Sequence, residues 1–154
     1  MREFHVRRLA GESEWAAAQD VRRRVFIDEQ GCPPALEWDE HDTPAARAGA
    51  CVHLLGLLDG EPVATARWRV VALAGAPAAK LERFAVLPAH RGRGLGRRLV
   101  AAAMDDARRA GHARFTLHAQ SHLVPLYAAF GFAPAGAPFY EAGIEHVKMV
   151  LTGE

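Results

Sequence analysis

The sequence has few cysteines and no long apolar run, and each shortage removes a class of protein. Two cysteines in 154 residues, Cys32 and Cys51, are too few for a disulfide framework, and they lack the short spacing of a metal-binding pair or the local signature of a nucleophile. The first fifteen residues contain no apolar core of signal-peptide length, and no segment approaches the length needed to span a bilayer. These absences predict a cytoplasmic protein, in a reducing compartment, that does not associate with membranes.

The sequence also lacks an excess of charge of either sign. Its formal net charge is +1, which does not favour a general affinity for nucleic acid. The basic residues gather in two places, at 22–24 and at 91–98, but no exposed aromatic residues alternate with them as in an RNA-binding surface. We therefore expect no nucleic-acid partner, and the run at 22–24 is typical of a solvated face.

Apolar periodicity and turn signals predict ten elements in one domain covering residues 1–154. Asp59-Gly60 lies between two apolar runs and predicts a tight hairpin, because a type I′ turn requires positive φ at both positions. Ser13 is the expected N-cap of the first helix, and 28–44 and 74–79 are expected to be mainly loops. Strands are expected at 4–9, on both sides of 59–60, and at 80–86, 114–118, 133–139 and 146–151, with helices at 13–26, 94–110 and 122–130. This order predicts a mixed α/β fold with hairpin and crossover connections.

The stretch LPAHRGRGLGRRLV, residues 87–100, combines three glycines with four arginines between a strand and a helix. Backbone N–H groups at a helix N-terminus are unpaired and carry partial positive charge, so they bind anions. Glycine allows an anion to approach them closely, and arginine adds bidentate donors for phosphate oxygens. The stretch lacks the Gly-Lys-Ser/Thr of a P-loop and the G-x-G-x-x-G spacing of a dinucleotide-binding turn. It therefore predicts a pyrophosphate cradle of another kind.

These residues resemble the GNAT (GCN5-related N-acetyltransferase) superfamily. Its signature, [Q/R]-x-x-G-x-[G/A] at the start of a helix after the fourth strand, is matched by Arg91-x-x-Gly94-x-Gly96. A second block, LYAAFGF at 126–132, resembles the last helix of the family and lies at the right distance. The stretches VFIDEQGCP and FYEAGIEHVKM are similar to the ElaA-like bacterial branch, and the resemblance covers essentially the whole chain.

The resemblance implies a GNAT-like fold, with a central, mostly antiparallel sheet that is flanked by helices and splayed between strands 4 and 5. It implies acetyl-CoA as cosubstrate and no metal. The pantetheine arm would pair with the backbone of Phe84, Ala85 and Val86, where a backbone N–H near Val86 would bind the thioester oxygen. The pyrophosphate would lie on the backbone amides of the signature loop, within reach of its arginines: Arg91, Gly92, Arg93, Gly94, Leu95, Gly96 and Arg97.

Tyr127 matches the tyrosine that faces the CoA sulfur in this family. A phenol is protonated at neutral pH and can donate to a departing thiolate, although a packed core aromatic is an alternative interpretation. Many members of the family carry Asn seven residues earlier, where it holds the pantetheine arm. Gln120 occupies that position here and offers the same amide on a longer stem.

The attacking amine must lose a proton, and several side chains are candidates to accept it. Glu82 is the first choice, because a central strand rarely carries a buried Glu without a purpose, with pairing to Arg83 or Arg114 as the structural alternative. Glu29 lies in the loop expected to cover the acceptor, and His118 ends the fifth strand near the same opening. A metal pair of His118 and His122 is not expected, because only the second lies on a predicted helix.

The resemblance predicts an enzyme that transfers an acetyl group from acetyl-CoA to a primary amine by direct attack in a ternary complex. The alternative is a non-catalytic acyl-CoA-binding sensor with the same fold. The acidic residues of 37–42 could attract a cationic amine or simply be solvated. A small-molecule amine, a peptide N-terminus and a lysine side chain all remain open as acceptors, and the family often forms homodimers.

Overall fold

The computed structural model describes residues 2–152, in which eight strands form one mixed sheet in the order β1-β2-β3-β4-β5-β8-β6, with β7 paired to β8. The expected domain limits, residues 1 and 154, lie outside this range. The strands are β1 (Phe4–Arg8), β2 (Cys51–Leu58), β3 (Glu61–Leu73), β4 (Ala76–Val86), β5 (Phe115–Gln120), β6 (Ala133–Pro134), β7 (Phe139–Glu141) and β8 (Ile144–Leu151). All neighbours are antiparallel except β4 and β5, which confirms the predicted fold class.

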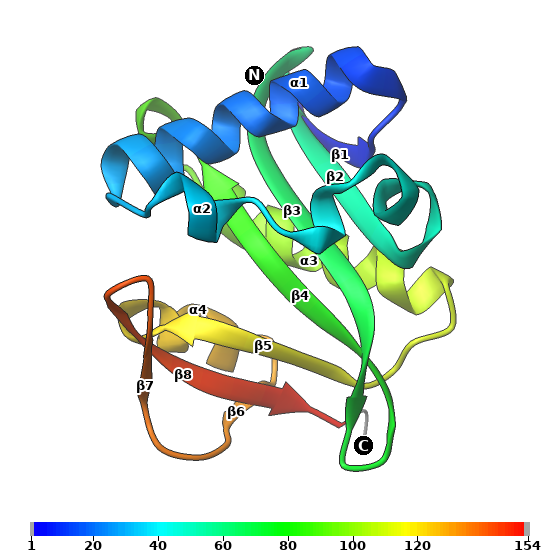
Figure 1. Ribbon diagram of the computed structural model, residues 1–154, viewed down its shortest axis with the longest axis vertical. Helices are drawn as coiled ribbons and strands as arrows, with labels where there is room; N and C mark the ends of the chain where they lie inside the picture. The colour runs from blue at the N-terminus through cyan, green and yellow to red at the C-terminus, as the bar shows by residue number, and fades with distance from the viewer. Residues whose placement is uncertain (1, 153–154) are drawn as a thin grey trace.

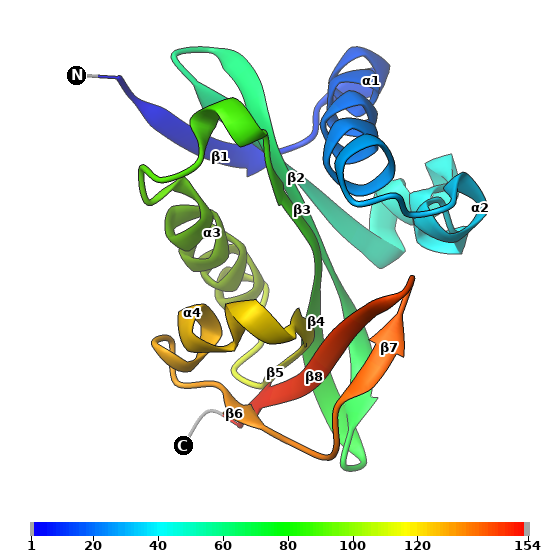
Figure 2. The ribbon, with the colours of Figure 1, turned by 90° about the vertical axis from the view of Figure 1, so that its left-hand side faces the viewer.

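Helices cover both faces of the sheet (Figures 1 and 2). One face carries α1 (Gly11–Arg22), its π-helical continuation η1 (Arg23–Glu29) and α2 (Pro34–Glu37). The other face carries α3 (Leu95–Arg109) and α4 (Val124–Ala128). Short helical turns complete the chain: η2 (Glu40–Asp42), η3 (Ala46–Ala50), η4 (Pro88–His90) and η5 (Ser121–Leu123).

The apolar spacing of α3 buries its inner face in the main core. Leu99, Val100, Ala103 and Met104 are at most 1% exposed, and they pack against the sheet beside buried residues of β5 and β8 such as Phe115 and Met149. Asp59 and Gly60 both have positive φ, 50° and 82°, which confirms the tight hairpin between β2 and β3. The long β3–β4 hairpin then turns at Ala74-Gly75, and strand β4 begins directly after it.

Three predicted elements differ from the observed ones. Helix α1 begins at Gly11 after the extended residue Ala10, so Ser13 lies inside the helix and is not its N-cap. Residues 76–79 are strand, because pairing with β3 extends the hairpin through this alanine-rich stretch. The ending contains three short strands in place of two, and its turn at Ala142-Gly143 separates β7 from β8.

Candidate active site at the splayed strands

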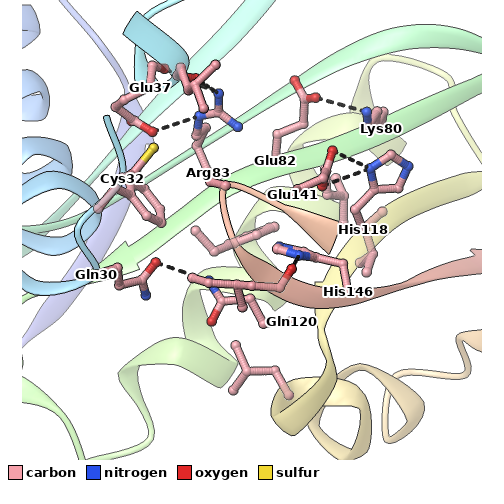
Figure 3. Close-up of a pocket in the computed structure, with 18 of the residues that line it drawn as sticks. Gln30, Cys32, Glu37, Lys80, Glu82, Arg83, His118, Gln120, Glu141 and His146 are labelled. Atoms are coloured by element: carbon pink, nitrogen blue, oxygen red, sulfur yellow. Dashed lines mark hydrogen bonds and ion pairs between the residues drawn. The ribbon is translucent and has the colours of Figure 1, made fainter. Parts of the chain in front are cut away.

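Strands β4 and β5 pair over only three residues and then separate. The register joins Ala79–Leu81 to Phe115–Leu117, after which β4 stays with β3 and β5 stays with β8 (Figure 1). A cavity of about 350 Å³ lies at this opening. Figure 3 shows its polar lining, which includes Gln30, Cys32, Glu37, Lys80, Glu82, Arg83, His118, Gln120, Glu141 and His146. The opening predicted between strands 4 and 5 is therefore present.

A bulge in β4 lies at the point of separation. Arg67 pairs with Glu82 and Thr65 with Ala85, so that Arg83 and Phe84 together face the single residue Ala66 of β3. Arg83 adopts a φ of 56°, an uncommon conformation for a residue with a side chain. Beyond the bulge, the N–H of Leu87 donates to the Val63 carbonyl, and the alternation of the strand turns the backbone groups of Val86 towards the open edge.

The three residues expected to pair with a pantetheine arm face different directions in this geometry. Ala85 pairs with Thr65 of β3, so its backbone groups face the neighbouring strand. Val86 presents its carbonyl at the open edge, where Nε of Arg91 donates to it over 2.9 Å. Phe84 lines the cavity with its ring, 6.2 Å from that of Tyr127. The open edge therefore offers an unpaired strand to an extended ligand, with Val86 as its available residue.

The glycine-rich loop leaves the N-terminus of α3 open. Gly92 and Gly94 have φ values of 79° and 76°, and a Cβ added at Gly92, Gly94 or Gly96 would meet no atom within 4 Å. Gly94 is the N-cap of this fifteen-residue helix, and no side chain caps it. Arg93 and Arg97 are exposed beside the loop, whereas the Leu95 side chain is buried and can contribute only its backbone. The first-turn amides therefore form an accessible anion site.

Glu29 and Gln30, at the end of η1, connect the two sides of the opening. The carboxylate of Glu29 accepts two hydrogen bonds from Arg91, at 2.5 and 2.6 Å. The next residue, Gln30, accepts a hydrogen bond of 3.1 Å from Gln120 at the end of β5 (Figure 3). We call this pair of contacts the strap. Glu29 and Arg91 thus lie together, and Gln120 lines the cavity in contact with a residue that the sequence analysis did not single out.

Tyr127 projects from α4 and is 5% exposed. Its ring packs near Phe84 and Phe132, and the residue lines the cavity. Within residues 2–152 no side chain or backbone group forms a hydrogen bond with its hydroxyl. Burial raises the pKa of the Tyr127 hydroxyl above its usual value, which keeps the phenol protonated and able to donate.

Glu82 lines the cavity as expected, but its carboxylate is fully engaged. It receives hydrogen bonds from Arg67 and Arg69 at 3.1 and 2.9 Å, and Lys80 lies 3.3 Å away. Burial alone would raise the pKa of this carboxyl, but the hydrogen bond from Arg69 and the charges of Arg67 and Lys80 lower it to about 2. Such a weakly basic group is a poor proton acceptor at neutral pH, which argues against the first choice from the sequence. Its partners are also not Arg83 or Arg114.

Three of the acidic residues at 37–42, Glu37, Asp39 and Asp42, form an ion-pair network with buried arginines, whereas Glu40 is exposed. Arg22 contacts Glu37 and Asp42, each at 2.6 Å, and Arg67 contacts Asp39 and Asp42 at 2.6 and 2.8 Å. Arg22 and Arg67 are each 1% exposed. These contacts fix the segment after α2 against α1 and β3. The arginine run at 22–24 is therefore divided, since Arg22 is buried and only Arg23 and Arg24 are solvated.

The far wall of the cavity contains two residues that the sequence analysis missed, Glu141 and His146. Nδ1 of His118 lies 3.3 Å from both carboxylate oxygens of Glu141 (Figure 3). His146, the first residue of the strand expected at 146–151, lines the cavity and donates from Nδ1 to the Ile144 carbonyl over 2.7 Å. The sequence signal for these two residues was the charged hairpin YEAGIEH. Its position beside β5 became known only from the strand pairing.

Both cysteines are free thiols. Burial raises the pKa of the Cys51 thiol to about 12, whereas Cys32 is half-buried at the cavity wall. No helix within residues 2–152 has the length and apolar character needed to cross a membrane.

The fold and the site define a mixed α/β protein with an opening between two splayed strands, an open glycine-rich helix N-terminus beside them and a buried tyrosine in the cavity. A family model described as an acetyltransferase (GNAT) domain matches residues 59–152. The chain therefore belongs to the GNAT superfamily.

Full-length relatives agree with this assignment. A Bacillus subtilis protein, provisionally named as an acetyltransferase, is 37% identical over 95% of each chain. The structure of Escherichia coli ElaA is 28% identical, with a TM-score of 0.80 over 97% of this chain and 99% of that one, which supports the ElaA-like branch. A Brucella melitensis GNAT-family acetyltransferase solved in complex with acetyl-CoA shares the fold, at 21% identity and a TM-score of 0.73 over 97% and 88% of the two chains.

Proposed function

We propose that this protein transfers an acetyl group from acetyl-CoA to a primary amine by direct attack in a ternary complex. The observation that carries the proposal is the arrangement of three features along one opening. Arg91 of the glycine-rich loop contacts Val86 of β4, and Phe84 of the same strand faces Tyr127 in the cavity, so these contacts lead from the anion site along the strand edge to the phenol. Acetyl-CoA presents its phosphates, amide arm and sulfur in that same order.

The donor's phosphates would lie on the amides of residues 92–96, where no side chain competes for them. Arg93 and Arg97 are exposed beside this loop and would add charge, while Arg91 is already held by Glu29. The pantetheine amides would extend along β4, with Val86 as the principal backbone partner. Gln120 would reach the arm only by exchanging its contact with Gln30.

Tyr127 would act as the general acid for the departing thiolate. The amine nitrogen attacks the thioester carbon, the C–N bond forms, and the C–S bond breaks with its electron pair on sulfur. The protonated phenol then donates to this sulfur, a role consistent with its raised pKa and with its lack of a hydrogen-bond partner in the described chain.

A non-catalytic sensor of acyl-CoA is the alternative with the same fold. A sensor needs only the donor half of the opening. Here the cavity that Tyr127 lines is also lined by polar side chains of β5, β7 and β8, including His118, Glu141 and His146. A formed acceptor compartment next to an intact Tyr127 favours the enzyme.

The test is thiol release from acetyl-CoA with a panel of amines, for the wild type and for Tyr127→Phe. We expect release that depends on the acceptor and falls at least about tenfold in the variant, with unchanged affinity for CoA. Tyr140→Phe is the matched control, because this second tyrosine is 72% exposed and lies outside the cavity lining. Binding of CoA without turnover for any amine would favour the sensor, and no binding at all would refute both functions.

A further inference from the structure

His118 and Glu141 form a couple on the acceptor side of the cavity. They come from different elements, His118 from β5 and Glu141 from the end of β7, and both line the cavity. The imidazole is about one-third exposed and the carboxylate about half, so both are accessible from the opening. His118 and Gln120 alternate with the buried Leu117 and Ala119 along β5, so the imidazole lies on the face opposite α3.

The contact fixes which nitrogen of His118 carries hydrogen. An ionised carboxylate only accepts hydrogen bonds, so Nδ1, which is 3.3 Å from both oxygens, must be the donor. In the neutral ring, Nε2 then holds a free lone pair. The hydrogen bond from His118 lowers the pKa of the Glu141 carboxyl, which keeps it ionised in this role.

The ring of Phe139 holds the imidazole in place. Its centroid lies 4.9 Å from that of His118 in an edge-on arrangement, and 6.0 Å from that of His146 in a stacked one. The other ionisable groups around the couple include Lys80 and Glu82 on β4 and, on β8, His146 and Lys148, which is directly opposite His118 in the strand register. Lys80 and Glu82 pair with each other, so neither competes for the contact between His118 and Glu141.

Within residues 2–152, the cavity-lining carboxylates other than Glu141, and Glu29 beside the opening, are occupied by arginine. Glu82 is held by Arg67 and Arg69, Glu29 by Arg91, and Glu37 by Arg22. We propose that His118 is the residue that accepts the proton from the attacking amine, and that Glu141 is its positioning residue. This inference rests on the proposed acetyl transfer and names the proton acceptor for it.

Nε2 of His118 takes one proton from the bound ammonium, which leaves a neutral amine with a lone pair. This lone pair forms the C–N bond, the C–S bond breaks, and the thiolate is protonated by Tyr127. The nitrogen loses its second proton through water, which restores the phenol. The products are the amide, the CoA thiol and one proton on His118, which passes to solvent.

The test uses amines that differ in basicity. Thiol release from acetyl-CoA is measured for the wild type and His118→Gln with propylamine, glycinamide and aminoacetonitrile, which are progressively less basic. We expect kcat/KM of the variant to fall about a hundredfold with the most basic amine and much less with the least basic, which needs no proton acceptor. The control is His122→Gln, because this exposed histidine lies outside the cavity lining.

An equal loss with all three amines, or no loss, would overturn the proposal. For Glu141→Ala we expect kcat to fall about tenfold with little change in KM. Nitrogen-15 NMR of the imidazole rings gives a second measurement that needs no acceptor. It should show hydrogen on Nδ1 of His118 in the wild type and mixed tautomers in Glu141→Ala. Hydrogen on Nε2 in the wild type would overturn the His118 assignment alone, whereas acetyl-CoA binding without any turnover would overturn the proposed function as well.

Discussion

At the scale of single residues, Glu82 shows how burial and charge set the chemistry of a carboxylate. Its side chain is only 8% exposed, so burial disfavours the ionised form. Arg67, Arg69 and Lys80 reverse this effect and lower the pKa to about 2. The same contacts that make Glu82 a weak base make it a strong structural anchor, because a buried guanidinium without its carboxylate is costly.

We therefore predict that Glu82→Gln destabilises the protein more than it impairs proton transfer. The folded pKa lies below the ordinary value of 4.5, so the ionised carboxylate stabilises the fold above that pH and the effect is lost as the pH falls towards 2. The shift corresponds to about 3 kcal/mol, at about 1.4 kcal/mol per pKa unit. Urea unfolding at pH 7 and at pH 3 should show the difference between wild type and variant shrinking at the lower pH.

Glu61→Gln is the control, since this exposed carboxylate at the start of β3 has no role in the network. A stability difference that does not change with pH would contradict the assigned pKa. A loss of turnover that grows with amine basicity, in a folded Glu82→Gln protein, would return the proton-acceptor role to Glu82.

At the scale of elements, the sequence predicted the segments whose signals are local. The period of α3, the Asp59-Gly60 turn and the glycine-rich loop each depend on neighbouring residues only. The partners of Glu82 and His118 were not predictable in this way. Arg67 faces Glu82 across the β3–β4 register, and Glu141 reaches His118 because β7 folds back on β8. The contacts of Glu82 with Arg67 and of His118 with Glu141 both depend on how distant strands pair. The pattern of a single sequence does not show that pairing.

The strap at the end of η1 provides a prediction about donor binding. Glu29 competes with an incoming pyrophosphate for Arg91, and its negative charge lies near the anion site. We expect Glu29→Gln to tighten CoA binding several-fold and Arg91→Ala to weaken it, as measured by calorimetry. Increasing salt should reduce both effects, because these side chains are exposed.

Asp105→Asn is the matched control for this experiment, because Asp105 pairs with exposed Arg109 near the far end of α3. Weaker CoA binding by Glu29→Gln would mean that Glu29 holds Arg91 in the orientation that binds phosphate. In that case the contact between Glu29 and Arg91 strengthens CoA binding and does not weaken it.

At the scale of the whole molecule, the sheet consists of two parts joined by a short parallel seam. Strands β1–β4 form one antiparallel part, and β5 with β6–β8 forms the other. Only Ala79–Leu81 and Phe115–Leu117 pair across the seam, and α3 connects the two parts along the chain (Figure 2). A ligand that adds a strand to the open edge of β4 would fill the gap between them.

We therefore predict that acetyl-CoA stabilises the protein and protects one localised edge from hydrogen exchange. At a hundredfold excess over Kd, binding adds about 2.7 kcal/mol and should raise Tm by roughly 5–10 °C. Exchange should slow at Val86 and at the amides of residues 92–96, while Leu54–Leu58 of β2, paired on both sides, should change little. If acetyl-CoA stabilises the protein without slowing exchange at the β4 edge, the donor binds elsewhere. If Tyr127→Phe shows the same protection by acetyl-CoA as the wild type, donor binding does not depend on the phenol, and the role of Tyr127 lies in the chemical step.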